Sequence, residues 1–311
     1  MISRVKRVPV SLSGCIQDPL MTAVIGPSSS DLSRYPADAP SIVLLHSFDS
    51  SCLEYRKLYP ILSAYLPTYA VDLVGWGFTD LSWLQGDTNT SIGPELKREH
   101  LRTFIEQCVG EERPVVLLGA SIGGAVAMDF ALAYPEKIKK LVLLDPQIFI
   151  DGIGAMGKLP RFLSVLGVKL LQTKWLRTQA NKIAFFDKVS LATDEAVRIG
   201  RLHTFLPGWL EGNVAFIRSG GYSVNSRMKQ VGNLGSKSLI LWGRNDEVLD
   251  PKLLKRLPVE LPDSTLVIID DCGHYPQLEK PESVAEHVLK FLQMQPRDKF
   301  KNKSESIIST V

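Results

Sequence analysis

The 311-residue sequence contains only four cysteines, and no two of them form a CxxC pair. This absence argues against a structural zinc site or a dithiol redox motif. A chain of this length can bury a large core without covalent cross-links, so we expect Cys15, Cys52, Cys108 and Cys272 to be reduced thiols. Reduced thiols in turn favour an intracellular protein.

The sequence also lacks a strong charge of either sign and any long hydrophobic run. Its 36 basic and 33 acidic residues leave a formal net charge of +3, which is too weak to predict binding to nucleic acid. No stretch reaches the apolar length of a membrane span, so stable membrane insertion is not expected. Neither nucleic acid nor a membrane is therefore an expected partner, and we predict a monomer or weak homodimer.

The N-terminal segment allows two interpretations. Residues 1–34 are rich in serine and contain no Glu and only two Asp, which weakly resembles a plastid transit peptide. They lack the apolar core of a secretory signal. We favour the alternative that 5–12 and 20–26 are two early strands of the domain. The expected compartment is therefore the cytoplasm, with the plastid as the alternative.

Apolar runs and helical patterns alternate through the first half of the chain. Continuous apolar runs are typical of parallel strands that are covered on both faces. This alternation predicts an α/β fold with a doubly wound, mostly parallel sheet. The expected strands are 41–48, 114–119 and 140–145, and 68–77 is expected to be a strand followed by a turn at Gly75 and Gly77. The expected helices are 53–65, 94–109 and 121–135, and the polar, proline-containing segment 28–40 is expected to be a loop.

The alternation stops between 147 and 235, where the periodicity is mostly helical. It resumes with apolar runs at 238–243 and 265–270 and a helix at 281–294. We therefore predict an α/β core made of 1–146 and 236–295, with 147–235 inserted as a helical lid. The polar residues 296–311 are expected to form a flexible tail.

The motif GASIGG at 119–124 is the strongest chemical signal. It matches G-x-S-x-G and lies between an expected strand and an expected helix. A serine on such a sharp turn needs a strained backbone, and Gly119 and Gly123 relieve the crowding around it. The motif therefore predicts Ser121 as a nucleophile, placed at a helix N-terminus that favours a developing negative charge.

A serine hydroxyl needs a base, and we select His274 from the five histidines. It lies on a loop between the last strand and the last helix, where parallel sheets place their chemistry. Asp246 follows the strand at 238–243 and gives the order Ser, Asp, His along the chain. Asp145, at the end of 140–145, is the alternative acid that orients the base, but we favour Asp246.

The segment LLHSF at 44–48 is expected to complete an oxyanion hole. A second backbone donor should come from the loop after the first central strand. We predict the N–H groups of Phe48 and Ile122 as the two donors, and His46 as the side chain that supports this loop.

These motifs together resemble the α/β-hydrolase superfamily, in its lidded branch of esterases, epoxide hydrolases, dehalogenases and carbon–carbon bond hydrolases. The resemblance covers roughly 40–294. LLHSF resembles the family's oxyanion segment, and VDLVGWGFTD at 71–80 its Asp-x-x-Gly-x-Gly loop. LWGRNDEVLDP at 241–251 resembles the acid loop, and CGHYPQLEKPE at 272–282 the histidine loop. Some features also resemble plant and cyanobacterial members.

One residue departs from the family pattern, because Ser47 stands where a glycine usually follows the oxyanion histidine. Its Cβ is expected to narrow the loop or to require a different backbone there. A serine nucleophile, in contrast to an aspartate, argues against the epoxide hydrolase and dehalogenase branches.

Three functions follow as hypotheses. The first is a serine hydrolase that cleaves a carboxylic ester or thioester through an acyl-enzyme, without a metal or organic cofactor. The second is a carbon–carbon bond hydrolase of a vinylogous diketone, which would need an arginine of the insert for the substrate carboxylate. Arg198, Arg201 and Arg218 are the candidates. The third is a small-molecule receptor on the same scaffold, which would show little or no turnover.

Overall fold

A mostly parallel sheet forms the centre of the molecule in the computed structural model, which describes residues 1–12, 18–87, 89–110, 114–234 and 238–294. Within these residues the sheet has eight strands in the order β1-β2-β4-β3-β5-β6-β7-β8. The first two pairings, β1 with β2 and β2 with β4, are antiparallel, and the others are parallel. The strands are β1 (Lys6–Val10), β2 (Leu20–Ile25), β3 (Ile42–Leu45), β4 (Thr68–Val71), β5 (Val115–Ala120), β6 (Ile138–Leu144), β7 (Ser238–Gly243) and β8 (Thr265–Ile269).

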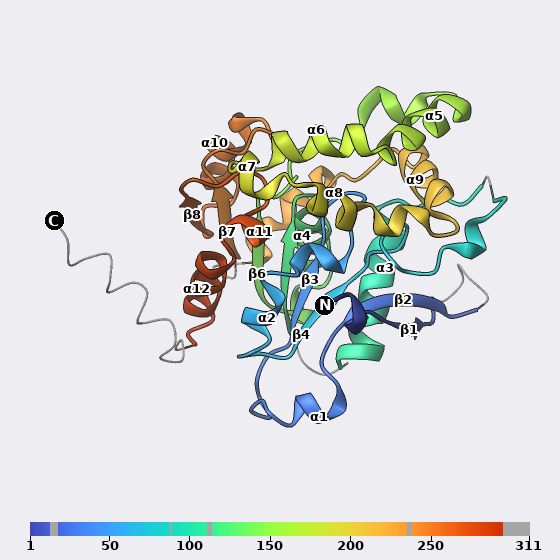
Figure 1. The fold of residues 1–311 in the computed structure, drawn as a ribbon. Helices are drawn as coiled ribbons and strands as arrows, with labels where there is room; N and C mark the ends of the chain where they lie inside the picture. The colour runs from blue at the N-terminus through green and yellow to red at the C-terminus, as the bar shows by residue number, and fades with distance from the viewer. Residues whose placement is uncertain (13–17, 88, 111–113, 235–237, 295–311) are drawn as a thin grey trace.

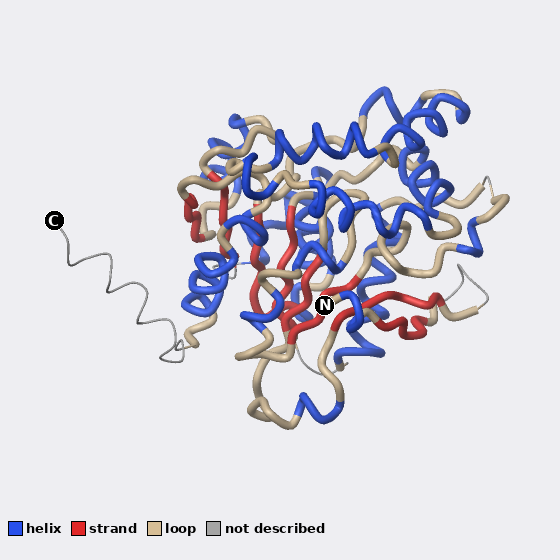
Figure 2. The backbone as a smooth tube through the Cα atoms, viewed as in Figure 1, coloured by secondary structure: helices blue, strands red, loops and turns tan. Residues whose placement is uncertain are grey.

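Helices cover both faces of the sheet, which explains the continuous apolar runs (Figure 2). Alternate residues of β3 enter two separate cores, with Val43 on one side and Leu44 on the other. The helices on the Val43 side include α3 (Pro94–Phe104) and α4 (Ile122–Ala133), and those on the Leu44 side include the short α2 (Tyr59–Leu62) and α12 (Pro281–Phe291). The predicted doubly wound fold is confirmed, as are the two early strands.

A helical insertion separates β6 from β7, as predicted. Figure 1 shows it over one end of the sheet, with α5 and α6 outermost. The division into core and lid at 146 and 236 stays a prediction, and the expected tail at 296–311 lies outside the described residues. The insertion contains η6 (Gly154–Lys158), α5 (Arg161–Leu171), α6 (Lys174–Ala184), α7 (Lys188–Leu191), α8 (Asp194–Arg201), η7 (Leu202–Phe205), α9 (Trp209–Arg218) and η8 (Asn225–Leu234).

Three local predictions differ from the structure. The expected helix at 53–65 is a 3-10 turn, η2 (Cys52–Tyr55), followed by the short α2, whose first turn contains a proline. The expected helix at 94–109 is α-helical to Phe104 and then a π-helical turn, η4 (Ile105–Val109), that ends at Gly110. The expected loop at 28–40 contains α1 (Ser29–Leu32), because Ser28 and Asp31 form a capping box.

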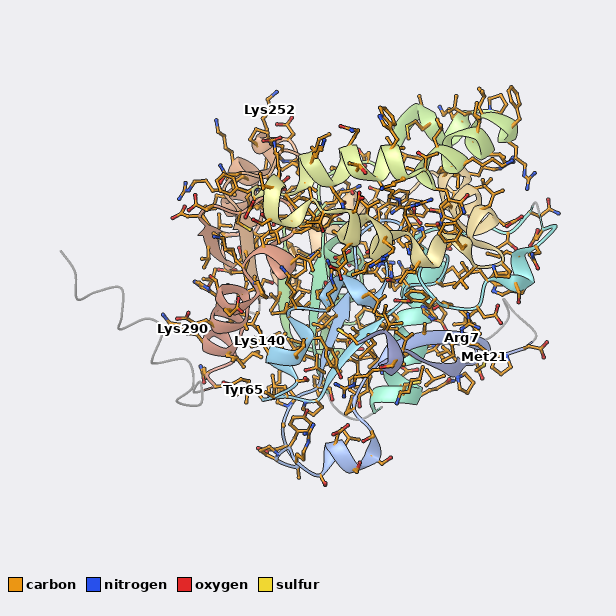
Figure 3. All side chains as sticks on the ribbon, viewed as in Figure 1. Arg7, Met21, Tyr65, Lys140, Lys252 and Lys290 are labelled. Atoms are coloured by element: carbon orange, nitrogen blue, oxygen red, sulfur yellow. The ribbon has the colours of Figure 1, made fainter. Side chains whose placement is uncertain are left out.

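The described part of the chain contains five further helical elements. They are η1 (Ile2–Arg4), η3 (Ser82–Leu84), η5 (Pro135–Lys137), α10 (Pro251–Glu260) and α11 (Pro276–Glu279). Lys140 of β6 lies beside α12 (Figure 3), with its Nζ 4.6 Å from the centre of the Phe291 ring. Among the described residues no helix combines the length and the apolar character that crossing a bilayer requires.

Candidate active site

Ser121 stands on a sharp turn between β5 and α4. Its backbone has φ 51° and ψ −117°, a left-handed region that is costly for a residue with a Cβ. The turn is held from both sides, because the Ser121 N–H donates to the Leu144 carbonyl at 2.9 Å and the Ser121 carbonyl accepts from the Gln147 N–H at 2.9 Å. Surrounding hydrogen bonds therefore maintain a strained serine at the carboxyl end of the central strand.

The two glycines of the motif allow the backbone to pack closely around this turn. A Cβ on Gly119 would lie 2.2 Å from the Gly123 carbonyl oxygen, and a Cβ on Gly123 would lie 2.2 Å from the Leu45 carbonyl oxygen. Neither contact is possible for a larger residue without movement of the backbone. The glycines are thus required by the close approach of β3, β5 and α4 beneath Ser121.

His274 and Asp246 are joined by a hydrogen bond of 2.8 Å between Nδ1 and Oδ2. Oδ1 of the same carboxylate accepts from the Val248 and Leu249 N–H groups. Burial acts to raise the pKa of Asp246, but these bonds and the adjacent His274 outweigh it and hold the pKa below its usual value. Asp246 is therefore an ionised acceptor that fixes the ring of His274 and leaves Nε2 available.

Asp145, the alternative acid, lies next to this pair but does not bond to the histidine. Its Oδ1 accepts from the Gly243 N–H at 2.9 Å, and its Oδ2 has no partner among the described residues. Burial, and then the neighbouring charge of Asp246, raise the pKa of Asp145 well above its usual range. Burial therefore favours the neutral, protonated form of Asp145 more than it would for an ordinary aspartate.

The two predicted oxyanion donors line the same cavity as Ser121 and His274. Among the described residues no acceptor bonds to the N–H of Phe48 or to that of Ile122. Unpaired backbone donors beside a nucleophile can bind a developing oxyanion. The structure records no hydrogen bond between the hydroxyl of Ser121 and His274; contacts of this kind often close only when substrate binds.

His46 is fully buried behind the predicted oxyanion loop. Its Nε2 accepts from the Leu73 N–H at 3.1 Å, and its Nδ1 lies 2.8 Å from the Ser47 carbonyl oxygen. A carbonyl can only accept, so the ring is neutral with its proton on Nδ1. Burial lowers the pKa of His46 to about 3. Support of the loop by His46 stays a prediction, and these two bonds are the contacts through which it would act.

Ser47, the departure from the family pattern, turns its side chain to a buried carboxylate. Its hydroxyl donates to Glu54 at 3.0 Å, and its backbone N–H donates to the same group at 3.1 Å. Gln277, from α11, donates to Glu54 at 2.8 Å. Burial raises the pKa of Glu54 despite these donors. Ser47 therefore holds the loop to Glu54 through its hydroxyl as well as its N–H, whereas a glycine at this position could bond only through its N–H.

A cavity of about 690 Å³ connects these groups with the insertion. Most of its wall is apolar and comes from the insertion, including Leu171, Leu176, Ile183 and Phe216. Cavities of this size and lining are typical of sites that bind small apolar molecules. The geometry therefore offers a serine, a histidine and two backbone donors to a substrate that is largely apolar.

Asp49 is a structural feature that sequence analysis missed. This carboxylate is only 2% exposed and follows the predicted oxyanion residue Phe48. It bonds to four side chains, all from the insertion: Arg177, His203, Trp209 and Asn213. These partners lie between 128 and 164 residues away in sequence, so no local pattern could have revealed them. Asp49 thus joins the oxyanion loop to the insertion.

Only one group of residues in the described chain could be considered for a metal, namely Asp145, Asp246 and His274, whose ligand atoms lie within 4.8 Å of one another. Two of these residues already bond to each other, and burial disfavours the charged form of the third, Asp145. The group is better suited to proton transfer than to ligation. The prediction that no metal or cofactor is needed stays a prediction.

Comparison with known proteins agrees with this fold. A model of the alpha/beta hydrolase family matches residues 42–287, and the chain belongs to that family. An alpha/beta hydrolase domain-containing protein of Arabidopsis thaliana, VTE7, is 36% identical over 94% of this chain and 84% of its own. A 2-hydroxy-6-oxononadienedioate/2-hydroxy-6-oxononatrienedioate hydrolase of Klebsiella pneumoniae is 28% identical over 81% of this chain and 86% of its own.

Solved structures with this fold catalyse more than one reaction. A meta-cleavage product hydrolase, CumD, superposes with a TM-score of 0.70 at 20% identity, covering 94% of this chain and 99% of the other. A thermophilic esterase from Thermogutta terrifontis gives a TM-score of 0.71 at 18% identity, covering 93% and 98%. At such identities the likeness establishes the fold alone. The protein is therefore a hydrolase of the α/β fold, and the bond it cleaves is a separate question.

Proposed function

We propose that the protein is a serine hydrolase that cleaves a carboxylic ester or thioester with a largely apolar substituent. The observation that carries the proposal is the arrangement around one apolar cavity of Ser121, the His274–Asp246 pair and two unpaired backbone donors. Acyl transfer needs a nucleophile, a base oriented by a carboxylate and donors for an oxyanion, and this arrangement offers a candidate for each.

In the first half-reaction the Oγ of Ser121 attacks the acyl carbon while Nε2 of His274 accepts the hydroxyl proton. The carbonyl oxygen becomes an oxyanion, which the Phe48 and Ile122 N–H groups stabilise. One such donor is typically worth about 3 kcal/mol of barrier. The tetrahedral intermediate then collapses, the bond to the alcohol or thiol breaks, and His274 protonates the leaving group.

In the second half-reaction His274 removes a proton from water, which attacks the acyl-enzyme and releases the acid and free Ser121. Asp246 remains ionised throughout and stabilises the imidazolium that forms in each half-reaction. Its lowered pKa fits this role, because it stays charged at neutral pH.

Carbon–carbon bond cleavage is the second candidate, and the names of the Klebsiella relative and of CumD favour it. Such a substrate carries a carboxylate that needs a cation. Arg177 is the one arginine or lysine among the described residues lining the cavity, and it already bonds to Asp49. None of Arg198, Arg201 and Arg218 lines the cavity. These observations support an uncharged ester over a dienoate.

The decisive experiment is labelling with a fluorophosphonate, a probe of activated serines, together with a panel of p-nitrophenyl esters. We expect wild-type protein to be labelled and to turn over esters, and Ser121→Ala to do neither. The variant should keep the thermal unfolding midpoint of the wild type, since only one hydroxyl oxygen is removed. Labelling that survives in Ser121→Ala would contradict the assignment of the nucleophile.

A ring-fission dienoate assayed in parallel separates the two reactions. Faster turnover of the dienoate than of every ester would favour carbon–carbon cleavage. The third hypothesis, a receptor on the same scaffold, predicts a ligand-induced rise of the melting temperature without turnover. Labelled protein that hydrolyses no ester or dienoate would favour that hypothesis.

A further inference from the structure

The outermost helices of the insertion carry large apolar side chains that point into solvent. Six of them form what we call the apolar patch: Phe162, Leu166, Leu170, Trp175, Ile183 and Phe186. Their exposed fractions range from 43% for Phe186 to 70% for Trp175. Single exposed apolar residues are ordinary, but a cluster on consecutive elements marks an interaction surface.

The patch follows from the sequence of α5. Phe162, Leu166 and Leu170 are spaced four residues apart and therefore share one stripe of the helix. The opposite stripe already has its partner, because Val168 is buried against Trp209 and Val214. The outer stripe is thus additional to what packing of the insertion requires.

The segment that carries the patch is basic, although Asp187 follows it directly and Asp194 pairs with Lys174. Between residues 152 and 186 the sequence contains six lysines and arginines and no aspartate or glutamate. Lys158, Lys169, Lys174 and Lys182 are exposed, and among the described residues only Lys174 of these four is in an ion pair. An exposed apolar stripe with Trp, Phe and Leu beside lysines is the composition of helices that lie on anionic lipid surfaces.

The patch also adjoins the mouth of the cavity. Ile183 belongs to the patch and also lines the cavity. Met156 is not part of the patch, but it is 54% exposed and lines the cavity as well. The cavity therefore extends from Ser121 to the surface that carries the patch. In Figure 1 this surface, formed by α5 and α6, lies at the opposite end of the molecule from α1.

A second copy of the chain suits this surface less well than a lipid surface. In a symmetric dimer the same patch would face itself, so the basic segments 152–186 of the two copies would meet, and only acidic residues outside that segment, such as Asp187 and Asp194, could pair with their lysines. An anionic bilayer offers both an apolar layer for the patch and phosphate groups for the lysines.

We propose that the apolar patch and the lysines around it dock the protein on the surface of an anionic lipid bilayer. The patch enters the interfacial layer, and the cavity mouth then faces the lipid. Docking needs no turnover and goes beyond the proposed function. An apolar ester dissolved in the bilayer could then reach Ser121 without crossing water.

The test is flotation with vesicles, using full-length protein and its Ser121→Ala variant, so that binding is measured independently of hydrolysis. We expect both proteins to float with vesicles of phosphatidylcholine and phosphatidylglycerol in equal parts, and to bind pure phosphatidylcholine about tenfold more weakly. Raising the salt from about 0.1 M to about 1 M should weaken binding to the anionic vesicles.

Two triple variants provide the comparison. Replacing Phe162, Leu166 and Trp175 by serine should lower binding about tenfold or more. Replacing Ile2, Met21 and Leu32 by serine removes three exposed apolar side chains outside the insertion, and should not lower it. Met21, labelled in Figure 3, belongs to β2 and lies well away from α5 and α6. Circular dichroism melts would establish that both variants fold.

Equal flotation of the two triple variants would overturn the proposal, and so would a wild-type protein that stays with the soluble fraction. Sedimentation velocity without lipid provides a further outcome. If the patch variant loses a dimer that the wild type forms, and vesicle binding is unchanged, the surface is an interface between copies of this chain. Loss of binding with ester hydrolysis in solution intact would leave the proposed function in place.

Discussion

Two buried carboxyl groups lie beside His274, and their pKa values are shifted in opposite directions. Asp246 bonds to the ring and has a lowered pKa, whereas Asp145 has a raised pKa and no bond to the ring. Only an ionised partner can stabilise the imidazolium that forms during acyl transfer. Substitution of Asp246 should therefore lower catalysis more than substitution of Asp145.

We expect Asp246→Asn to lower kcat for p-nitrophenyl esters about a thousandfold or more, because the amide favours the wrong tautomer of His274. Asp145→Asn should change kcat by about threefold or less, because Asp145 makes no hydrogen bond to His274 and burial already disfavours its charged form. Steady-state kinetics at neutral pH measures both. A loss of kcat in Asp145→Asn as large as that in Asp246→Asn would indicate that Asp145, which follows β6, is the acid that orients His274.

His100 provides a test of pH dependence away from the site. It is 1% exposed and bonds to Thr22 at 2.7 Å, and burial lowers its pKa from 6.5 to about 3. Below pH 6.5 the unfolded chain therefore binds a proton at His100, whereas His100 of the folded chain stays unprotonated until the pH reaches about 3. The stability that neutral His100 contributes is present above pH 6.5 and is lost as the pH falls toward 3.

At pH 5 this effect should reduce the free energy of unfolding of the wild type by about 2 kcal/mol relative to pH 7. His100→Gln cannot bind that proton, so its unfolding free energy should change less over the same interval, whatever its value at pH 7. Urea unfolding at several pH values measures the two slopes. Parallel slopes would mean that His100 is protonated in the folded protein.

At the scale of single residues, the sequence predicted which loops carry the candidate site residues, but not every contact that those loops make. Ser121 and His274 could be placed because each lies in a short motif at the end of an apolar run. Asp49 could not, because its four partners come from another part of the chain. The hydroxyl bond of Ser47 to Glu54 was also not predictable, since η2 was expected to be an ordinary helix.

At the scale of elements, the turn from β5 to α4 depends on the absence of a side chain. A Cβ on Gly119 would overlap the Gly123 carbonyl oxygen at 2.2 Å, and backbone cannot yield as a flexible side chain can. We expect Gly119→Ala to lower the free energy of unfolding by about 1–3 kcal/mol and to abolish labelling of Ser121. Chemical denaturation and fluorophosphonate labelling measure the two effects.

Gly200→Ala is the matched control, because a Cβ at this position of α8 meets nothing within 4 Å. It should leave labelling unchanged and stabilise the protein by up to about 1 kcal/mol, since alanine favours a helix more than glycine does. If Gly119→Ala were as stable and as reactive as Gly200→Ala, the close packing of the turn would not be needed.

The pattern of apolar residues predicted a strand or helix correctly where one face or both faces of that element are buried. The runs of β3 and β5 are apolar because both faces of the sheet are covered, and they were found without ambiguity. The segment at 53–65 was not, because its apolar residues are buried around a 3-10 turn and a single helical turn. Periodicity cannot separate such a segment from a continuous helix.

At the scale of the whole molecule, the insertion supplies most of the cavity wall, and the core supplies the groups that we propose to react. We therefore expect that exchanging 147–235 for the corresponding segment of the Arabidopsis relative will change the preferred acyl chain length while labelling of Ser121 persists. The exchange should retain residues able to bond to Asp49. Unchanged preference across a series of p-nitrophenyl esters would place specificity in the core.

Asp49 also determines how the molecule should come apart. One buried carboxylate of the core accepts hydrogen bonds from α6, η7 and α9, which are spread over much of the insertion. Lifting the insertion away would leave that charge buried without partners, at a cost of several kcal/mol. Partial opening is therefore penalised, and core and insertion should melt as one cooperative unit, with a single calorimetric peak and equal calorimetric and van't Hoff enthalpies.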